Sequence, residues 1–303
     1  MAEVQWFPGH MAKTIRELGE MIKVCDLVLE LCDARVPRSS RNPILDELTQ
    51  GKLRLLVLNK ADLADSQASA AWLEHFEQED RQAMAINALK TGDVRKLQNQ
   101  IQKMSAPIKA KAEARGRRSR PIRILICGVP NVGKSSLINS LIGRKKAATA
   151  NKPGVTRSLQ WLKLGTELQL LDSPGLLWPK LETKEAQIAL GAVAAVKDDL
   201  LPREELAAEL LLLLLEHYSF TLAGQLDFSE DDLASVFEQK SREEAAHRAL
   251  YLLAQSFKLM KQAGEPDLQR ASQFVLKQFR AASWGRFTLE FPEDIRNKEL
   301  DLA

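Results

Sequence analysis

The sequence lacks the features that mark exported and membrane proteins. Residues 1–10 have neither the basic nor the apolar segment of a secretory signal. The longest apolar run, residues 206–215, is broken by an acid and is far shorter than a membrane span, so it predicts a buried helix. Cysteine is scarce, without metal-binding spacing, and each copy lies in or beside an apolar run: Cys25, Cys32 and Cys127. We therefore expect buried thiols in a cytoplasmic protein that does not bind membranes.

A large net charge is also lacking, but the two signs are separated along the chain. The net charge is +3, yet residues 1–179 carry 28 Lys and Arg against 18 Asp and Glu, and residues 180–303 carry 15 against 22. Within the second part, residues 180–239 have a net charge of −9 and residues 240–286 a net charge of +5. Alternating blocks are typical of a protein that touches a polyanion with selected surfaces, although solvated helix faces would give the same pattern.

Residues 1–179 alternate between strand-like and helical patterns. The strand-like segments are 27–32, 53–58, 83–86, 122–127, 159–164 and 168–171. The helical segments are 11–22, 41–50, 66–78, 93–104 and 135–143. This alternation predicts an α/β fold with a largely parallel sheet. Residues 103–123 hold eight basic residues and one acid, which predicts a surface connector.

Beyond about Pro179 the strand pattern gives way to helices. The helical segments there are 184–197, 203–218, 229–238, 241–262 and 267–281. Strand-like alternation returns only at Arg286–Phe291. A chain of this length usually forms about two domains, so we expect an α/β domain over residues 1–179 and a mostly helical domain over residues 180–303.

Residues 128–135 (GVPNVGKS) match the phosphate-binding loop G-x-x-x-x-G-K-[ST], between a strand and a helix. Gly128 and Gly133 would let the backbone curl so that its N–H groups face phosphates. Lys134 should reach the β- and γ-phosphates, and Ser135 should ligate Mg²⁺. The same loop supplies the further candidate nucleotide contacts Asn131, Val132 and Ser136.

The tetrapeptide Asn59-Lys60-Ala61-Asp62 follows an apolar strand and has the form N-K-x-D. Asp62 can accept two hydrogen bonds from guanine N1 and N2, each worth about 1.5–3 kcal/mol, whereas adenine offers no such pair. Lys60 can lie along the plane of the base. Alone the tetrapeptide is a weak signal, but beside a phosphate loop it favours GTP over ATP. Asn87 and Ala88 are candidates for the last base contact, with the Ala88 N–H toward guanine O6; a plain turn at the strand end is the alternative.

Residues 172–175 (DSPG) fit the segment that senses the γ-phosphate. Asp172 should hold Mg²⁺ through water, and the Gly175 N–H should meet the γ-phosphate. Thr156 offers a hydroxyl for Mg²⁺ and the γ-phosphate, and Thr149 is a less well placed alternative. The glutamine that orients the attacking water in many GTPases is missing, because Leu176 stands there.

Two explanations of that missing glutamine remain open. Hydrolysis is slow, or another polar group takes over the role. His10 is a candidate because the preceding Pro8-Gly9 suggests a shaped loop. An exposed or capping histidine is the simpler interpretation of the same residue.

The motifs stand in an unusual order. In an ordinary small GTPase the N-K-x-D segment follows the phosphate loop, whereas here it precedes that loop by about seventy residues. The order becomes normal when the sequence begins at Pro121, runs through the phosphate sensor, and returns to the start of the chain. This predicts a circularly permuted domain, which is tolerated when the original termini are close and at the surface.

The combination resembles the circularly permuted GTPases of the ribosome biogenesis GTPase A family, over residues 4–180 and more loosely over residues 285–289. The segments that support the resemblance are residues 6–11 (WFPGHM), 33–37 (DARVP), 59–62 (NKAD), 128–135, 153–156 (PGVT) and 172–175. The resemblance implies a Ras-like domain followed by a helical RNA-binding domain. It also implies a role in late maturation of the bacterial large ribosomal subunit.

The resemblance further implies GTP or GDP, Mg²⁺ and K⁺ as cofactors. The precursor of the large subunit, with its rRNA and ribosomal proteins, would be the partner of a monomer. The family's catalytic histidine falls on His10, its potassium-linked asparagine on Asn131, and its hydrophobic replacement for glutamine on Leu176. Asn87-Ala88 departs from the more common Ser-Ala, which leaves that base contact open.

Two other functions are alternatives to a GTP-driven assembly factor. One is an RNA-modifying or metabolic enzyme with a regulatory GTPase domain. Residues 180–303 contain no metal-ligand cluster, nucleophile–base set or dinucleotide fingerprint that would support it. The other is a module that binds GTP without turning it over, and Leu176 keeps this alternative open.

Overall fold

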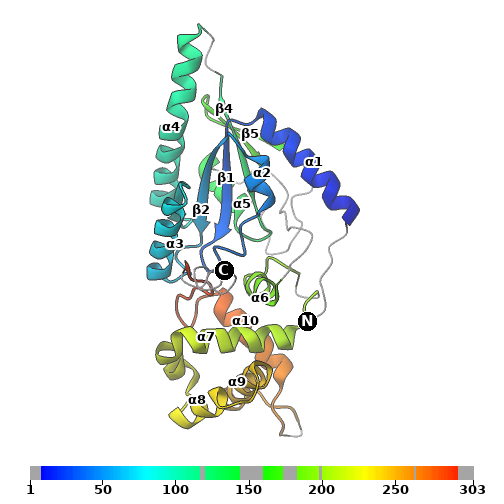
Figure 1. Cartoon of the computed structure of the whole chain (residues 1–303). Helices are drawn as coiled ribbons and strands as arrows, with labels where there is room; N and C mark the ends of the chain where they lie inside the picture. Colours follow the sequence, from blue (N-terminus) through cyan, green and yellow to red (C-terminus); the bar gives the residue numbers. More distant parts are fainter. Residues whose placement is uncertain are drawn as a thin grey trace, which may run out of the picture.

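The computed structural model describes residues 8–116, 120–143, 160–172, 183–197, 200–262 and 264–292 (Figure 1). For residues 8–14, 160 and 172 it describes the backbone only.

A six-stranded sheet forms the centre of the first half of the chain. Its strands are β1 (Leu27–Asp33), β2 (Leu53–Asn59), β3 (Ala83–Ile86), β4 (Ile122–Gly128), β5 (Gln160–Leu164) and β6 (Leu168–Asp172). Their order is β3-β2-β1-β4-β6-β5, and only the edge strand β5 is antiparallel to its neighbour. The carboxyl ends of the five parallel strands therefore meet at one edge, where α/β folds bind ligands.

The path of the chain through this sheet confirms the circular permutation. The chain runs outward from β1 to β3, returns to the centre, and then runs outward from β4 through the β5–β6 hairpin. The central strands β1 and β4 are neighbours, with Leu31 paired to Gly128. Starting the sequence at β4 restores the order in which an unpermuted GTPase domain builds the same sheet. The predicted α/β fold with a permuted P-loop domain is correct.

Helices cover both faces of the sheet, so its central strands are buried throughout. One face packs against α1 (Pro8–Val24), α2 (Ile44–Leu48) and α3 (Ser66–Gln78), and the other against α4 (Thr91–Ala114) and α5 (Lys134–Ile142). All seven residues of β1 are buried, as expected of a parallel strand between two helical layers. The three cysteines are free and buried, as predicted.

Two segments of the α/β domain differ from the prediction. Only Ile44–Leu48 of residues 41–50 is helical. Helix α4 runs to Ala114 and not only to the predicted residue 104, so the first half of the basic segment 103–123 is helical. The reason is that Ile101, Met104 and Ile108 prolong the apolar stripe that packs against the sheet.

The described residues of the second half of the chain are mostly helical, as predicted, but two of the helices end at Ala192 and Ser256, before the predicted residues 197 and 262. It contains α6 (Lys184–Ala192), α7 (Arg203–Leu226), α8 (Glu230–Phe237), α9 (Arg242–Ser256) and α10 (Leu268–Arg280). Figure 1 shows α7 lying across the base of the α/β domain, with α8 and α9 on its far side. By length and composition alone α7 could cross a membrane, but its leucines are buried in the helical core. It runs past residue 218, across a break in helical geometry at Tyr218.

Buried charge helps to fix these helices against one another. Glu209 of α7 is 1% exposed and faces Lys184 of α6 and Arg242 of α9. Because a buried carboxylate requires charged partners, this acid specifies how the three helices meet.

The strand-like segment Arg286–Phe291 forms no strand in the described structure and instead returns to the α/β domain. The Leu289 N–H donates to Arg35 O at 2.8 Å, and Trp72 Nε1 donates to Glu290 O at 2.8 Å. The Glu290 carboxylate accepts bonds from the N–H groups of Arg38 and Ser39. The prediction of a strand failed because the consecutive residues Phe287, Thr288 and Leu289 are all buried by packing against other parts of the chain, and not alternately as in a strand of a sheet.

Candidate nucleotide-binding site

The loop between β4 and α5 has the curled backbone that a phosphate site requires. Gly128, Asn131 and Gly133 have positive φ angles of 152°, 58° and 103°. A Cβ atom on Gly128 would lie 2.3 Å from Leu31 O on the adjacent strand. Glycine is therefore required at position 128 by close approach as well as by conformation.

Helix α5 presents its amino end to the inside of this curl. Its first-turn N–H groups and dipole favour an anion there. The Lys134 side chain is buried, and its Nζ lies 3.0 Å from both Gly128 O and Val129 O. Ser135 and Ser136 follow on the first turn and are partly exposed, whereas the Val132 side chain is packed in the core.

One side chain joins the phosphate loop to the N-K-x-D loop, residues 59–62, which we call the base-reading loop. Asn59 is 2% exposed, and its Nδ2 donates to Val132 O at 2.7 Å. Its Oδ1 accepts the Ala88 N–H at 3.0 Å. Three loops that are far apart in the sequence are thus held together by one buried amide.

The base-reading loop places its two charged residues differently. Lys60 has a left-handed backbone with φ 61°, and its Nζ lies 2.8 Å from Asp33 Oδ2. Asp62 is exposed at the rim of the site, where a carboxylate can meet a guanine edge. The loop therefore offers the Lys60 ammonium, held in place by Asp33, and the exposed Asp62 carboxylate.

The Asn87-Ala88 segment forms a turn at the end of β3. Asn87 Oδ1 accepts the Leu89 N–H at 2.8 Å, and the Asn87 N–H donates to Asp93 Oδ2 at 3.0 Å. The Ala88 N–H, expected to face guanine O6, is bonded to Asn59 in this structure. A base contact at Ala88 requires this N–H to be shared with Asn59 or released by it.

A contact between the phosphate loop and the helical domain was not predicted from the sequence. Asn131 Nδ2 donates to Ala194 O at 2.7 Å, across the interface. Ala194 has a positive φ of 58° in the turn after α6. The same asparagine that was assigned to K⁺ thus holds a turn of the second domain.

The remaining candidates lie partly or wholly outside the described residues. Asp172 ends β6 beside Ile126, two residues before the phosphate loop, but only its backbone is described. His10 lies in the first turn of α1, again without a described side chain. Thr156, Gly175 and Leu176 are outside the described residues.

An ion pair that sequence reasoning left without a role lies beside the base-reading loop. Asp33 ends β1 and accepts two bonds from Arg35, from Nε to Oδ1 and from Nη2 to Oδ2, both at 2.9 Å. Burial would raise the pKa of Asp33, but the charges of Arg35 and Lys60 outweigh it and hold that pKa well below its ordinary value. The signal in the sequence was an acid at the end of a mostly apolar strand, at the edge where ligands bind.

The permuted sheet, the curled loop at the start of α5 and the N-K-x-D loop beside it define a P-loop GTPase of circularly permuted type. A family model described as 50S ribosome-binding GTPase matches residues 123–251. That match begins in β4 and leaves out the base-reading loop, which the permutation has moved to an earlier position in the chain.

Full-length relatives identify the family. Ribosome biogenesis GTPase A of Bacillus licheniformis is 37% identical, with 96% of this chain and 99% of the relative covered. Mitochondrial ribosome-associated GTPase 1 of Bos taurus is 32% identical, with coverages of 94% and 88%. The chain belongs to the ribosome biogenesis GTPase A family.

Solved structures support the fold. The crystal structure of GNP-bound YlqF from T. maritima has a TM-score of 0.61 at 24% identity and covers 93% of this chain and 99% of its own. The GDP-bound structure of the same protein has a TM-score of 0.59.

Proposed function

We propose that this chain binds GTP and GDP with Mg²⁺ at the carboxyl edge of its sheet and hydrolyses GTP there. The observation that supports this most directly is the Asn59 amide, which brings Val132 of the phosphate loop and Ala88 of the last loop into one site. The base would lie against Lys60 and Asp62. The phosphates would lie over the amino end of α5, where Lys134 and Ser135 stand.

We assign Mg²⁺ to Ser135, Thr156 and, through water, Asp172. Hydroxyl and carboxylate oxygens are the ligands that this hard cation prefers. K⁺ would bind the Asn131 amide oxygen, since the amide nitrogen is bonded to Ala194. His10 would place the attacking water, the role that Leu176 cannot fill. The cations would offset the negative charge that spreads over the phosphoryl group in the transition state.

We propose that the partner is the late precursor of the large ribosomal subunit, met in the cytoplasm by a monomer through rRNA and ribosomal proteins. The relatives' names point to the ribosome. The boundary between the GTPase domain and the RNA-binding domain is placed at residues 179 and 180. Exposed cations of the second domain support the choice of partner: Lys258, Lys261, Arg270, Lys277 and Arg286.

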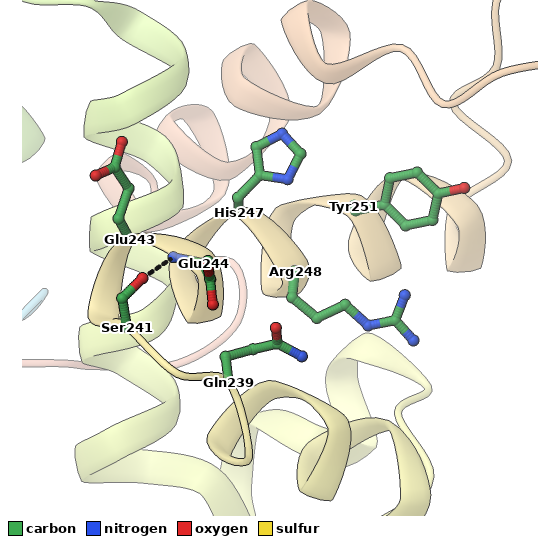
Figure 2. Close-up of a pocket in the computed structure, with 7 residues that line it drawn as sticks. All are labelled: Gln239, Ser241, Glu243, Glu244, His247, Arg248 and Tyr251. Atoms are coloured by element: carbon green, nitrogen blue, oxygen red, sulfur yellow. Dashed lines mark hydrogen bonds between the residues drawn. The ribbon is translucent and has the colours of Figure 1, made fainter.

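A hollow on α9 offers an aromatic ring beside a further cation. Figure 2 shows its lining, with His247 and Tyr251 on the upper side of α9, Arg248 extending below Tyr251, and the acids Glu243 and Glu244 toward the other end. The Arg248 guanidinium carbon lies 5.9 Å from the centre of the Tyr251 ring. Such a pair suits a stacked base beside a phosphate.

Arg280, by contrast, has a structural role and does not belong to the surface that would bind RNA. Its guanidinium donates to Gly191 O at 2.9 Å and to Ala192 O at 3.0 Å, at the end of α6. Charge reversal at Arg280 would disturb the turn that contacts Asn131. Lys277, one turn earlier and exposed, is the better position for testing RNA binding.

Multiple-turnover GTP hydrolysis, with and without purified large subunits, tests the activity. We expect slow turnover alone, acceleration by subunits, and a higher rate in K⁺ than in Na⁺. His10→Ala should lower the rate with little change in GTP affinity. No turnover under any of these conditions would favour the alternative of a module that holds GTP without hydrolysing it. Equal rates in the two salts would remove K⁺ from the mechanism.

Nucleotide state is expected to control partner binding. The chain passes from Asp172–Gly175 into the second domain within a few residues, so a rearrangement on γ-phosphate binding would be delivered directly to it. We expect tighter subunit binding with a non-hydrolysable GTP analogue than with GDP, by about tenfold if the coupling is of ordinary size. Equal sedimentation with subunits in both states would refute this coupling.

A further inference from the structure

The segment DARVP, residues 33–37, has no part in the nucleotide site proposed above, yet its first two residues contact that site directly. The Ala34 N–H donates to Asn59 O at 2.9 Å. The Asp33 carboxylate binds the Lys60 ammonium at 2.8 Å and is only 1% exposed. Two of the base-reading residues are therefore fixed by this segment before any ligand is present.

Arg35 links the same carboxylate to the helical domain. Its guanidinium, 2% exposed, forms a forked pair with Asp33 and lies 5.2 Å from the centre of the Phe279 ring on α10. Its carbonyl accepts the N–H of Leu289, in the segment that follows α10. A planar guanidinium can make both contacts at once, whereas a lysine could not.

A second set of contacts joins the base-reading region to the helical domain. Asp65, three residues after the base-reading loop, caps α3, and its N–H donates to Thr288 Oγ1 at 3.2 Å. The Tyr218 hydroxyl, at the break in α7, lies 3.1 Å from Asp65 Oδ2 and accepts the Thr288 N–H at 3.1 Å. The helical domain thus contacts both of the segments that adjoin residues 59–62 in the structure.

We propose that Asp33 and Arg35 are positioning residues for the base-reading Lys60, and that they make guanine nucleotide affinity depend on the docking of α10 and residues 286–291. The inference rests on the proposed nucleotide site. It differs from coupling through residues 172–175, because that route senses the γ-phosphate. The base is common to GTP and GDP, so this second route should change the binding of both nucleotides equally.

The first test compares Asp33→Asn with Glu30→Gln in the full chain. Glu30 is a matched control because it is a buried acid on the same strand, paired with Arg54 away from the base-reading loop. Release of fluorescent GDP should be at least about tenfold faster in Asp33→Asn, because a charge-assisted bond to Lys60 is lost, and unchanged in Glu30→Gln. Hydrolysis in a single turnover at saturating GTP should be the same in both, since neither residue touches the reacting phosphate.

The second test examines the link to the helical domain. Phe279→Leu removes the ring beside Arg35, and Phe274→Leu is the control on the same helix, where the ring packs on Phe257 and Trp284 instead. We expect faster GDP release only in Phe279→Leu. Equal release from the two variants would overturn the dependence on the helical domain.

Further variants separate a failure of the positioning inference from a failure of the proposed nucleotide site. If Asp33→Asn does not fold, Arg35→Lys keeps the charge but loses the forked geometry, and should also release GDP faster. Asp62→Asn in the same assay must lose GDP affinity. If it does not, the proposed nucleotide site is wrong. If Asp62→Asn loses affinity while Asp33→Asn and Arg35→Lys match Glu30→Gln, only the positioning inference is overturned.

Discussion

Asn59→Ala is expected to lower both the stability of the fold and its affinity for nucleotide. Asn59 is buried, so its removal leaves Val132 O and the Ala88 N–H without their partner inside the protein. An unsatisfied buried group costs about 1–3 kcal/mol, so we expect the free energy of unfolding to fall by about 2–6 kcal/mol. Urea unfolding without nucleotide measures this loss.

The same change should weaken GDP and GTP together. The nucleotide would have to restore the alignment of the three loops on binding, and each 1.4 kcal/mol of that cost is a factor of about ten in the dissociation constant. We expect both constants to rise by at least about tenfold, measured by titration calorimetry at a temperature where the variant is folded.

Asn42→Ala is the matched control for this prediction. Asn42 is also a buried amide, but its Oδ1 accepts the Ile44 N–H before α2, away from the three loops. The Asn42→Ala variant should lose stability and keep the GDP affinity of the parent. If the dissociation constant of Asn59→Ala for GDP is within about threefold of that of the parent, the loops are held by other contacts and the prediction is wrong.

Three further predictions concern base choice, acid stability and RNA binding. Asp62→Asn should exchange guanine for xanthine preference, because an amide can donate to the xanthine 2-oxo group; unchanged GTP affinity with no gain for xanthosine nucleotides would contradict this. Asp33 has a lowered pKa in the fold, so the parent should lose stability as the pH falls through the ordinary carboxyl value of about 3.9 toward the lower folded value. Asp33→Asn should lose less over the same range in urea unfolding, and parallel pH profiles would refute the assignment. Reversing the charges of Lys261 and Lys277 should weaken subunit binding and reduce its salt dependence. Lys96→Glu, an exposed change on α4, serves as the control, and GDP affinity should be unchanged in all these charge variants.

Local patterns were sufficient to predict most of the fold. β3 and α3 occupy the predicted residues, and β1, β2, β4 and β6 each extend one residue beyond the prediction. These elements were predictable because alternation, apolar runs and loop chemistry act within a few residues. The permutation was predictable too, since it depends only on the order of motifs.

Boundaries were less predictable where packing extends or ends a helix. Helix α4 continues to Ala114 because Met104 and Ile108 reach apolar neighbours on the sheet, a contact that a basic composition conceals. Residues 286–291 have a strand-like pattern but hydrogen-bond to Arg35 and Trp72, in another part of the chain.

The sequence by itself determined the sheet, the phosphate loop and the residue types that we assign to guanine recognition. Only the tertiary structure decided how these parts depend on one another. It placed Asn59 between three loops, Asn131 against Ala194, and Arg35 between Asp33 and Phe279. Partners this distant in the sequence leave no periodic pattern along the chain. Each contact forms only when folding removes two polar or charged groups from water and leaves them to satisfy one another.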